Sequence, residues 1–179
     1  MSLCIIINLV ILFTLANGFL IQNGTGSGSI FQSNGCPDGW TRYDLHCYNY
    51  SSSRKTWTTA ENTCEQFGGH LVVIEDNDED SFIGRFIERS LKLSNYAVYD
   101  RTFNYTWIGA SDIAKEGNWL WVTGKPVGVY TNWRGPGPNN GNNGSHTENC
   151  MDWSFGGWND SHCAGHLNFV CEIESNGIP

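Results

Sequence analysis

The sequence predicts an α+β fold with two helices, short antiparallel sheets and one long irregular loop. Eight tryptophans and 21 glycines in 179 residues favour short strands, bulges and loops over a helical bundle. The six cysteines beyond residue 18 are enough for three disulfides, a usual framework for a small exported domain. At this length a single domain is expected, and 40% hydrophobic residues supply an ample core.

Residues 1–18 have the pattern of a secretory signal peptide. An apolar run from Leu3 to Leu15 precedes Ala16-Asn17-Gly18, which has the small-x-small form of a cleavage site. A short membrane anchor is the alternative, but the run is shorter than the roughly 18 apolar residues that a span requires. We therefore expect a secreted, extracellular protein with no membrane span. The Gly-, Ser- and Asn-rich residues 19–35 are expected to form a flexible leader.

Cysteines and sequons both suit the secretory route. Cys4 leaves with the signal peptide, and the sequence by itself leaves many pairings open for the six that remain. No Cys-x-x-Cys pair occurs, which argues against a zinc-finger or thioredoxin-like site. Five Asn-x-Ser/Thr sequons predict a glycoprotein. They lie at Asn23, Asn49, Asn104, Asn143 and Asn159.

The charge pattern excludes one partner class and one metal motif. A net charge of −8 argues against nucleic acid as a partner. It is compatible with cation binding, although a solvated acidic surface is the commoner meaning. The acidic run 76–80 does not fit an EF-hand, because that loop needs Gly at its sixth position and Glu at its twelfth, where this chain has Ser81 and Ile87. We interpret the run as the charged start of a helix.

The first half of the chain predicts a hairpin over residues 40–50, then a helix, a short strand over 70–74 and a second helix. The first helix begins near Thr56 and stops at Gly68-Gly69. Its apolar face consists of Trp57, Ala60, Cys64 and Phe67. The second helix runs from about Asp78 to Leu91. Its apolar stripe consists of Phe82, Ile83, Phe86, Ile87 and Leu91.

The second half predicts strands around one long loop. A connection over 95–105 leads to strands at 107–110 and 118–122. Residues 131–147 are dominated by Gly, Pro and Asn and must form an irregular loop, and long ordered loops are often functional. The closing strands are expected at 151–155, 158–163 and 169–173.

The long loop and the strands after it carry four oxygen-bearing side chains: Asn139, Glu148, Asn159 and Asp160. Carboxylate and amide oxygens are the ligands that a hard cation such as Ca²⁺ prefers. The same groups can exchange hydrogen bonds with sugar hydroxyls. This stretch therefore predicts a cation site, a carbohydrate site, or both.

Several motifs of the chain resemble, in order and spacing, the C-type lectin-like domain in its six-cysteine form. The match covers residues 36–173, which we take as the domain, with 174–179 as a tail. The motifs are Cys36-Pro37-Asp38-Gly39-Trp40, Trp57 through Cys64, Trp107-Ile108-Gly109-Ala110, Glu148-Asn149-Cys150, Trp158-Asn159-Asp160, Cys163 and Phe169-Val170-Cys171-Glu172. The resemblance implies the disulfides Cys36–Cys47, Cys64–Cys171 and Cys150–Cys163.

In the sugar-binding members of this family, one Ca²⁺ is held at positions that correspond to Gly137, Asn139, Glu148, Asn159 and Asp160 of this sequence. Two sugar hydroxyls complete the metal shell. The resemblance also implies a cis bond before Pro138, and the Pro138-Asn139 pair favours mannose- or glucose-type sugars. Gly137 departs from the pattern, because the family has Glu or Gln there. A weakened Ca²⁺ site is one interpretation, and a loop without usable sugar affinity is the other.

Some family members hold a second Ca²⁺ at positions that correspond to Asp112, Glu116, Asn140 and Asn149. Solvated loop residues are the alternative interpretation. Four tryptophans are expected in the core: Trp40, Trp57, Trp107 and Trp158. Trp133 and Trp153 border the loop and are candidates for stacking on a sugar. His162 and His166 flank Cys163 but lack a third partner for a metal site.

Three classes of function are to be weighed for this sequence. The leading one is a secreted, Ca²⁺-dependent lectin for mannose- or glucose-type sugars, with microbial glycans as a target class in innate immunity. The second is a lectin-like domain that binds a protein without Ca²⁺, which Gly137 favours. An enzyme is disfavoured, because neither a His-Glu-x-x-His site nor a Gly-x-Ser-x-Gly elbow occurs. A glycan on Asn159 would block the sugar site.

Overall fold

The computed structural model describes residues 35–93, 105–141 and 147–175. The expected signal peptide and almost all of the expected leader lie outside these residues. So do most of the connection expected at 95–105 and of the tail, and the sequons at Asn23, Asn104 and Asn143. In the part of the chain that is described, no helix is both long and apolar enough to cross a membrane.

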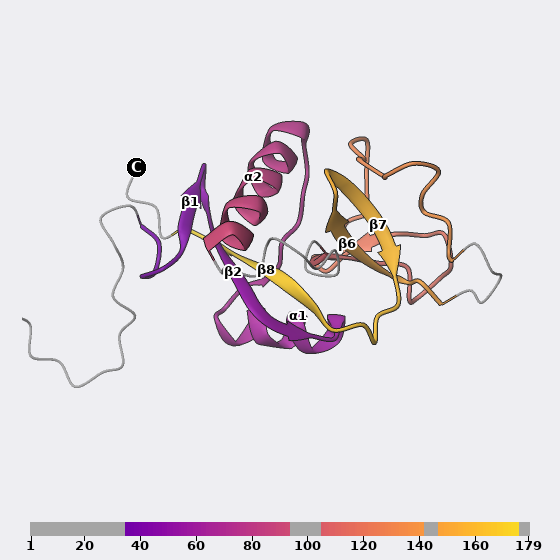
Figure 1. The fold of residues 1–179 in the computed structure, drawn as a ribbon, viewed down its shortest axis with the longest axis horizontal. Coiled ribbons are helices and arrows are strands. Elements are labelled where there is room, and N and C mark those ends of the chain that lie inside the picture. The colour runs from indigo at the N-terminus through magenta and orange to yellow at the C-terminus, as the bar shows by residue number, and fades with distance from the viewer. Residues whose placement is uncertain (1–34, 94–104, 142–146, 176–179) are drawn as a thin grey trace, which may run out of the picture.

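Within the residues that the structure describes, the fold has two helices and eight strands (Figure 1). The helices are α1 (Trp57–Gln66) and α2 (Asn77–Leu93). The strands are β1 (Thr41–Tyr43), β2 (His46–Lys55), β3 (His70–Leu71), β4 (Thr106–Ser111), β5 (Leu120–Trp121), β6 (Cys150–Ser154), β7 (Gly157–Ser161) and β8 (Leu167–Glu174). The predicted α+β class with two helices is confirmed. The strands expected at 70–74 and 118–122 are shorter than predicted, at His70–Leu71 and Leu120–Trp121, and the second strand of the hairpin extends to Lys55.

The strands form one mixed sheet in the order β1-β2-β8-β4-β6-β7, with β3 on β8 and β5 on β4. The expectation of antiparallel sheets needs one correction, because β4 and β8 pair in parallel. A parallel pair requires a long crossover. The long loop and the β6–β7 hairpin, which lie between β4 and β8 in the sequence, provide it.

Helix α1 begins and ends at the predicted signals. Thr56 caps its first turn, since its side chain accepts a hydrogen bond from the backbone N–H of Thr59. The chain turns away at Gly68, which has a φ of +82° that suits glycine. Phe67 was expected on the buried face but is 57% exposed. It lies at the C-cap, past the last helical turn, and meets the edge of Trp40 with ring centroids 5.7 Å apart.

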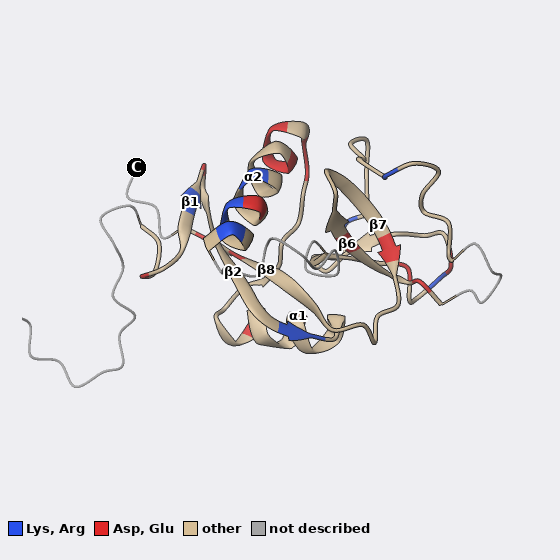
Figure 2. Ribbon diagram, viewed as in Figure 1, with Lys and Arg blue, Asp and Glu red and all other residues tan. Residues whose placement is uncertain are grey.

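Helix α2 starts with the acidic run, as predicted. Asp76 Oδ1 accepts hydrogen bonds from the backbone N–H groups of Asp78 (2.9 Å) and Glu79 (2.8 Å). Three acids occupy the first turn, where the helix dipole favours negative charge (Figure 2). Two of these acids, Glu79 and Asp80, are buried rather than solvated. The sequence did not predict their inward direction.

The core has two parts, and disulfides join its elements. One part contains Trp57, Ala60 and Cys64 of α1, and the other contains Ile83, Ile87 and Leu91 of α2. All three expected disulfides are present: Cys36–Cys47, Cys64–Cys171 and Cys150–Cys163. Trp40, Trp57, Trp107 and Trp158 are buried as expected.

The two helices lie on opposite sides of the β2–β8 pair, with α1 below and α2 above in Figure 1. The β6–β7 hairpin and the loops that precede it occupy the end of the molecule away from β1. The fold therefore presents the oxygen-rich stretch of the sequence at one end, on a rigid sheet and a disulfide-tied hairpin.

Candidate functional site

The long loop is fastened along β7 by backbone hydrogen bonds. Arg134 N donates to Trp158 O at 2.8 Å, and Trp158 N donates to Asn132 O at 2.7 Å. This contact forms a parallel bridge between Trp133 and Trp158. Further along the loop, the Gly137–Pro138 peptide bond is cis, which confirms the expectation for Pro138. The chain then delivers Asn139 to the end of β7.

Asp160 is the centre of the site. Its Oδ2 accepts hydrogen bonds from the backbone N–H groups of Asn139, at 2.8 Å, and of Asn140. The residue is 1% exposed, yet Oδ1 has no hydrogen-bond partner among the residues that the structure describes. A buried carboxylate oxygen without a partner is unfavourable, so a ligand or a cation at this position stabilises it.

The side chains of Asn139 and Glu148 both lie beside Gly141. Asn139 Oδ1 accepts a hydrogen bond from Gly141 N at 3.1 Å. A Cβ at Gly141 would lie 3.5 Å from Glu148 Oε2, so the glutamate side chain reaches this turn directly. Asn140 closes the group, since its Oδ1 accepts from Glu148 N at 3.0 Å. The structure therefore brings Asn139, Glu148 and Asp160 close together.

Asn159 joins this group less directly. Its Nδ2 donates to Asp160 O at 2.6 Å, to Asp152 Oδ2 at 3.2 Å and to Ser161 Oγ at 3.2 Å. Adjacent residues of a strand point to opposite faces, so Asn159 and Asp160 approach the site from different sides of β7. Because its nitrogen is committed to three acceptors, the carbonyl oxygen of Asn159 is the group left for a cation or a hydroxyl.

Three of the four residues expected at a second cation position, Asp112, Glu116 and Asn149, lie near one another. Asp112 is 2% exposed, its backbone N–H donates to Asn149 O at 3.1 Å, and its Oδ2 accepts from Gly117 N at 2.8 Å. In the described parts of the chain, neither Asp112 Oδ1 nor Asn149 Oδ1 has a hydrogen-bond partner. Burial raises the pKa of Asp112, and the nearby charges of Glu116 and Asp160 raise it further.

These features together suit a divalent cation. At the two expected cation positions, three of the buried oxygens that lack partners within the described residues are Asp112 Oδ1, Asn149 Oδ1 and Asp160 Oδ1. Acidic segments gather at the end of β7 and in the adjoining loops (Figure 2). Burial and, to a smaller extent, the charges of Glu116 and Asp160 raise the pKa of Asp112, and a nearby cation would favour the charged carboxylate. Hard oxygen donors of this kind match Ca²⁺, which takes six to eight oxygens at about 2.3–2.6 Å.

Gly137 supplies no side-chain oxygen, but its backbone leaves room for one. Its φ lies outside the left-handed region. A Cβ there would lie 3.2 Å from Arg134 O and 3.7 Å from the ring of Trp133. A side chain at this position therefore requires only a small shift of the turn at residues 134–137.

The aromatic and histidine candidates divide between surface and core. Trp153 is 5% exposed and packs in the α2 part of the core, so its ring does not stack on a ligand. Trp133 is partly buried, with its ring centroid 5.0 Å from that of Trp119 and 6.1 Å from that of Trp158. His162 and His166 are both exposed. His162 Nε2 lies 2.9 Å from Thr147 Oγ1.

Two buried acids support the site although the sequence pattern did not single them out. Asp152 is fully buried, and its Oδ2 also accepts from Ser161 Oγ at 2.7 Å; burial raises its pKa to about 6. Asp80 accepts hydrogen bonds from Tyr130 Oη, Asn132 Nδ2 and Trp158 Nε1, which fasten the loop and β7 to α2. In the sequence, Asp152 is marked only by its position as an acid inside the otherwise apolar segment 150–153.

The comparisons with known proteins agree with this geometry. The family model described as the Lectin C-type domain matches residues 53–173. The chain belongs to the C-type lectin domain family. A perlucin-like protein of Mytilus galloprovincialis is 33% identical over 157 residues, which cover 86% of this chain and 92% of the relative. The chain spans less than a third of the length of several other relatives.

Solved C-type lectin structures share the fold. The carbohydrate-recognition domain of the mouse scavenger receptor C-type lectin superposes with a TM-score of 0.67 at 31% identity, over 79% of this chain and 100% of that one. A calcium-independent type II antifreeze protein superposes with a TM-score of 0.62 at 26% identity, over 78% of this chain and 95% of that one. Domains of this family are typically non-enzymatic and bind carbohydrate.

Proposed function

We propose that this C-type lectin domain is a secreted, Ca²⁺-dependent carbohydrate-binding protein for mannose- or glucose-type sugars. Asn139, Glu148, Asn159 and Asp160 would hold the cation and contact the sugar, and Asp112, Glu116, Asn140 and Asn149 would hold a second ion. The observation that carries the proposal is the 1%-exposed Asp160, whose Oδ1 has no partner in the described part of the chain, beside the convergent Asn139 and Glu148.

In the proposed site, each residue would have a separate role in binding the sugar or in holding the loop. Bound Ca²⁺ supplies a centre that polarises two sugar hydroxyls. Glu148 accepts a hydrogen bond from one hydroxyl, and the carbonyl oxygen of Asn159 faces the ligand because its nitrogen is held by Asp152 and Ser161. Asp160 positions the loop through its two backbone contacts. This work needs no catalytic group, so we propose a binding protein rather than an enzyme.

A lectin-like domain that binds a protein partner without Ca²⁺ is the second candidate. Gly137 favours it, because the site lacks one carboxylate. A family relative of known structure is also calcium-independent. Under this alternative, the hydrogen bonds from the loop to Asp160 and Asp80 keep the loop in shape, and the exposed loop surface is the contact region.

Secretion completes the proposal. Residues 1–18 would be removed as a signal peptide, 19–35 would form a leader, and 36–173 would form the lectin domain before a short tail. Three disulfides suit an oxidising compartment. Microbial glycans are the proposed class of natural target. Asn159 is a sequon residue within the site, so we propose that it carries no glycan in the sugar-binding form.

Affinity chromatography distinguishes the two candidates. The full secreted protein should be retained on mannose-agarose in millimolar Ca²⁺ and released by EDTA. Galactose-agarose is the matched control and should retain less protein, because the Pro138-Asn139 pair favours the other hydroxyl arrangement. If the protein is not retained on mannose-agarose at saturating Ca²⁺, and if Ca²⁺ leaves its melting temperature unchanged, the calcium-independent alternative is favoured.

A substitution at Gly137 tests the missing ligand. We expect Gly137→Glu to strengthen Ca²⁺-dependent mannoside binding by roughly tenfold or more, because a charge-assisted interaction contributes about 1.5–3 kcal/mol and about 1.4 kcal/mol is tenfold. Gly137→Ala is the control for the Cβ, which would lie 3.2 Å from Arg134 O. Calorimetric titration of both variants measures the effect. A folded Gly137→Glu protein that binds no better than Gly137→Ala would contradict the role of position 137.

A further inference from the structure

A groove of about 850 Å³ lies between α2 and the strands β1 and β2. The β6–β7 hairpin and the long loop occupy the other end of the molecule, so the groove is remote from the proposed sugar site (Figure 1). Sites for small ligands have volumes of about 300–1,000 Å³, and this groove falls in that range. Its lining includes aromatic rings, hydroxyls and guanidinium groups, and no acid among the described residues.

Two arginines border the groove from the helix. Arg85 and Arg89 lie one turn apart on α2, and both are exposed. Within the described residues, neither guanidinium group has an ion pair or a hydrogen bond. Glu88 lies between them in the sequence but borders a separate cavity, which Arg85 borders as well. The groove therefore carries two unpaired positive charges, and these favour an anionic ligand.

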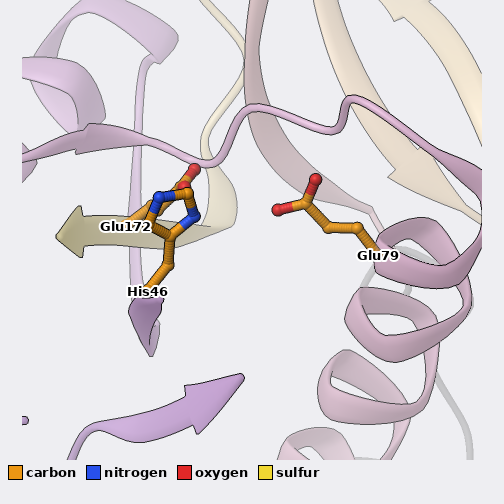
Figure 3. Close-up of side chains that lie close together, drawn as sticks. All are labelled: His46, Glu79 and Glu172. Atoms are coloured by element: carbon orange, nitrogen blue, oxygen red, sulfur yellow. The ribbon is translucent and has the colours of Figure 1, made fainter. Parts of the chain in front are cut away.

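The acids in the first turn of α2 leave these charges in place. Figure 3 shows Glu79 reaching from the helix towards His46 and Glu172, which lie side by side on the sheet. Asp80 holds the long loop and β7 through its three hydrogen bonds. Asp78 is exposed, but it lies about 10 Å along the axis from the first arginine, at a rise of about 1.5 Å per residue. Exposed charges at that separation are largely screened at about 0.1 M salt.

Aromatic side chains give the groove a fixed wall. Phe82 and Phe86 of α2 both line it, and their rings stack with centroids 5.9 Å apart and an angle of 7° between the planes. Phe82 also stacks on Tyr43 of β1, with centroids 4.3 Å apart. Tyr50 lines the groove from β2. These contacts hold the wall in one shape, so a ligand meets a preformed surface that is partly apolar.

The strand side of the groove is polar. Thr41 and Ser52 line it with their hydroxyls exposed, and Asn49 adds an amide. Hydroxyl and amide groups both donate and accept hydrogen bonds, as the hydroxyls of a sugar do. An acyl chain of a lipid would leave these groups without partners, which is unfavourable. The lining therefore suits a ligand that is rich in hydroxyls and also carries negative charge.

An acidic peptide is the competing ligand, because part of the edge of β2 is open. In the described chain, β1 pairs with β2 only at His46–Tyr48, so the edge beyond Tyr48 has no strand on this side. An extended peptide can add to such an edge. However, the register of β2 shifts between Ser51 and Lys55. Irregularities of this kind twist an edge away from further pairing, which disfavours the peptide.

We infer that this groove binds an anionic polysaccharide, one whose sugar units carry sulfate or carboxylate groups. Arg85 and Arg89 would bind the anionic groups, since a guanidinium group presents paired N–H donors to the oxygens of an anion. The net charge of the chain is −8, so the attraction must be local. Figure 2 shows basic segments on β1 and on the later turns of α2, next to the groove. This binding needs no Ca²⁺ and does not rest on the proposed function.

Direct binding of dextran sulfate to the full secreted protein tests the inference. The measurement is made in EDTA, so its outcome is separate from that of the Ca²⁺-dependent sugar site. We expect dextran sulfate to bind, uncharged dextran of the same length not to bind, and the affinity to fall as salt is added. Carboxymethyl-dextran, the third probe, identifies the anion: binding comparable to that of dextran sulfate assigns the groove to carboxylate as well as sulfate.

Two double variants with the same loss of charge locate the site. Arg85→Gln with Arg89→Gln should weaken binding at least about tenfold, equal to about 1.4 kcal/mol. Lys92→Gln with Lys115→Gln is the matched control, because both lysines are exposed and neither lines the groove; it should bind as the wild type does. All four substitutions are at exposed positions, so the melting temperatures should stay close to that of the wild type.

Three results would overturn the inference. No binding of dextran sulfate, or equal binding of uncharged dextran, would show that the arginines do not select an anionic sugar chain. Equal losses in the two double variants would mean that the polyanion responds to overall charge and not to this groove. Poly-L-glutamate that binds more tightly than dextran sulfate, and loses affinity in the arginine variant alone, would assign the groove to an acidic peptide.

Discussion

Asp160→Ala is expected to abolish Ca²⁺-dependent sugar binding and to loosen the long loop. The substitution removes the buried Oδ1, the proposed cation ligand, and also Oδ2, which holds the backbone N–H groups of Asn139 and Asn140. Hydrogen bonds to a charged group contribute about 1.5–3 kcal/mol each. Loss of the ligand and of the loop's anchorage should therefore lower Ca²⁺ affinity by at least about a hundredfold, since about 1.4 kcal/mol is tenfold.

Asp160→Asn is the matched control for the two roles. It retains one oxygen that can accept from Asn139 N but loses the charge, so the loop should stay in place while Ca²⁺ binds weakly. Calorimetry with Ca²⁺ measures the affinity, and hydrogen exchange of residues 139–141 reports on the loop. An Asp160→Ala protein that still binds mannose-agarose in an EDTA-sensitive manner would show that the cation lies elsewhere.

Removal of the Cys64–Cys171 disulfide is expected to produce the largest loss of stability. This bond closes a separation of 107 residues, against 11 for Cys36–Cys47. The chain-entropy estimate gives about 5 kcal/mol for the long loop and about 3 kcal/mol for the short one. Since whole domains are stable by about 5–15 kcal/mol, the Cys64→Ala, Cys171→Ala double variant should be close to unfolding at about 37 °C.

Urea unfolding of the two double variants checks this ranking. The Cys36→Ala, Cys47→Ala protein is the control, because it also loses one disulfide and two buried sulfurs. Its midpoint should fall less than that of the Cys64→Ala, Cys171→Ala protein at a similar slope. Equal midpoints would mean that the length of the closed loop does not determine how much each disulfide stabilises this fold.

The helices and their ends were determined by the sequence alone, because their causes are local. Thr56 caps α1 and Gly68 ends it through hydrogen bonds and dihedral angles within a few residues. The acidic start of α2 likewise follows from neighbours in the chain. The disulfide pairing required the resemblance to C-type lectins, since six cysteines leave many pairings open. The roles expected for the four motif residues of the loop and β7 came from the same source.

The tertiary structure decided which acids are buried and what they hold. Glu79 and Asp80 belong to one acidic run, yet Glu79 faces His46 and Glu172 whereas Asp80 holds the loop and Trp158. Asp152 lies beside Asn159 only because β6 and β7 pair in a register that sets them opposite each other. Local pattern fixes the period of an element, but burial and partners depend on segments that are far apart in sequence, so these contacts arise only when the sheet closes.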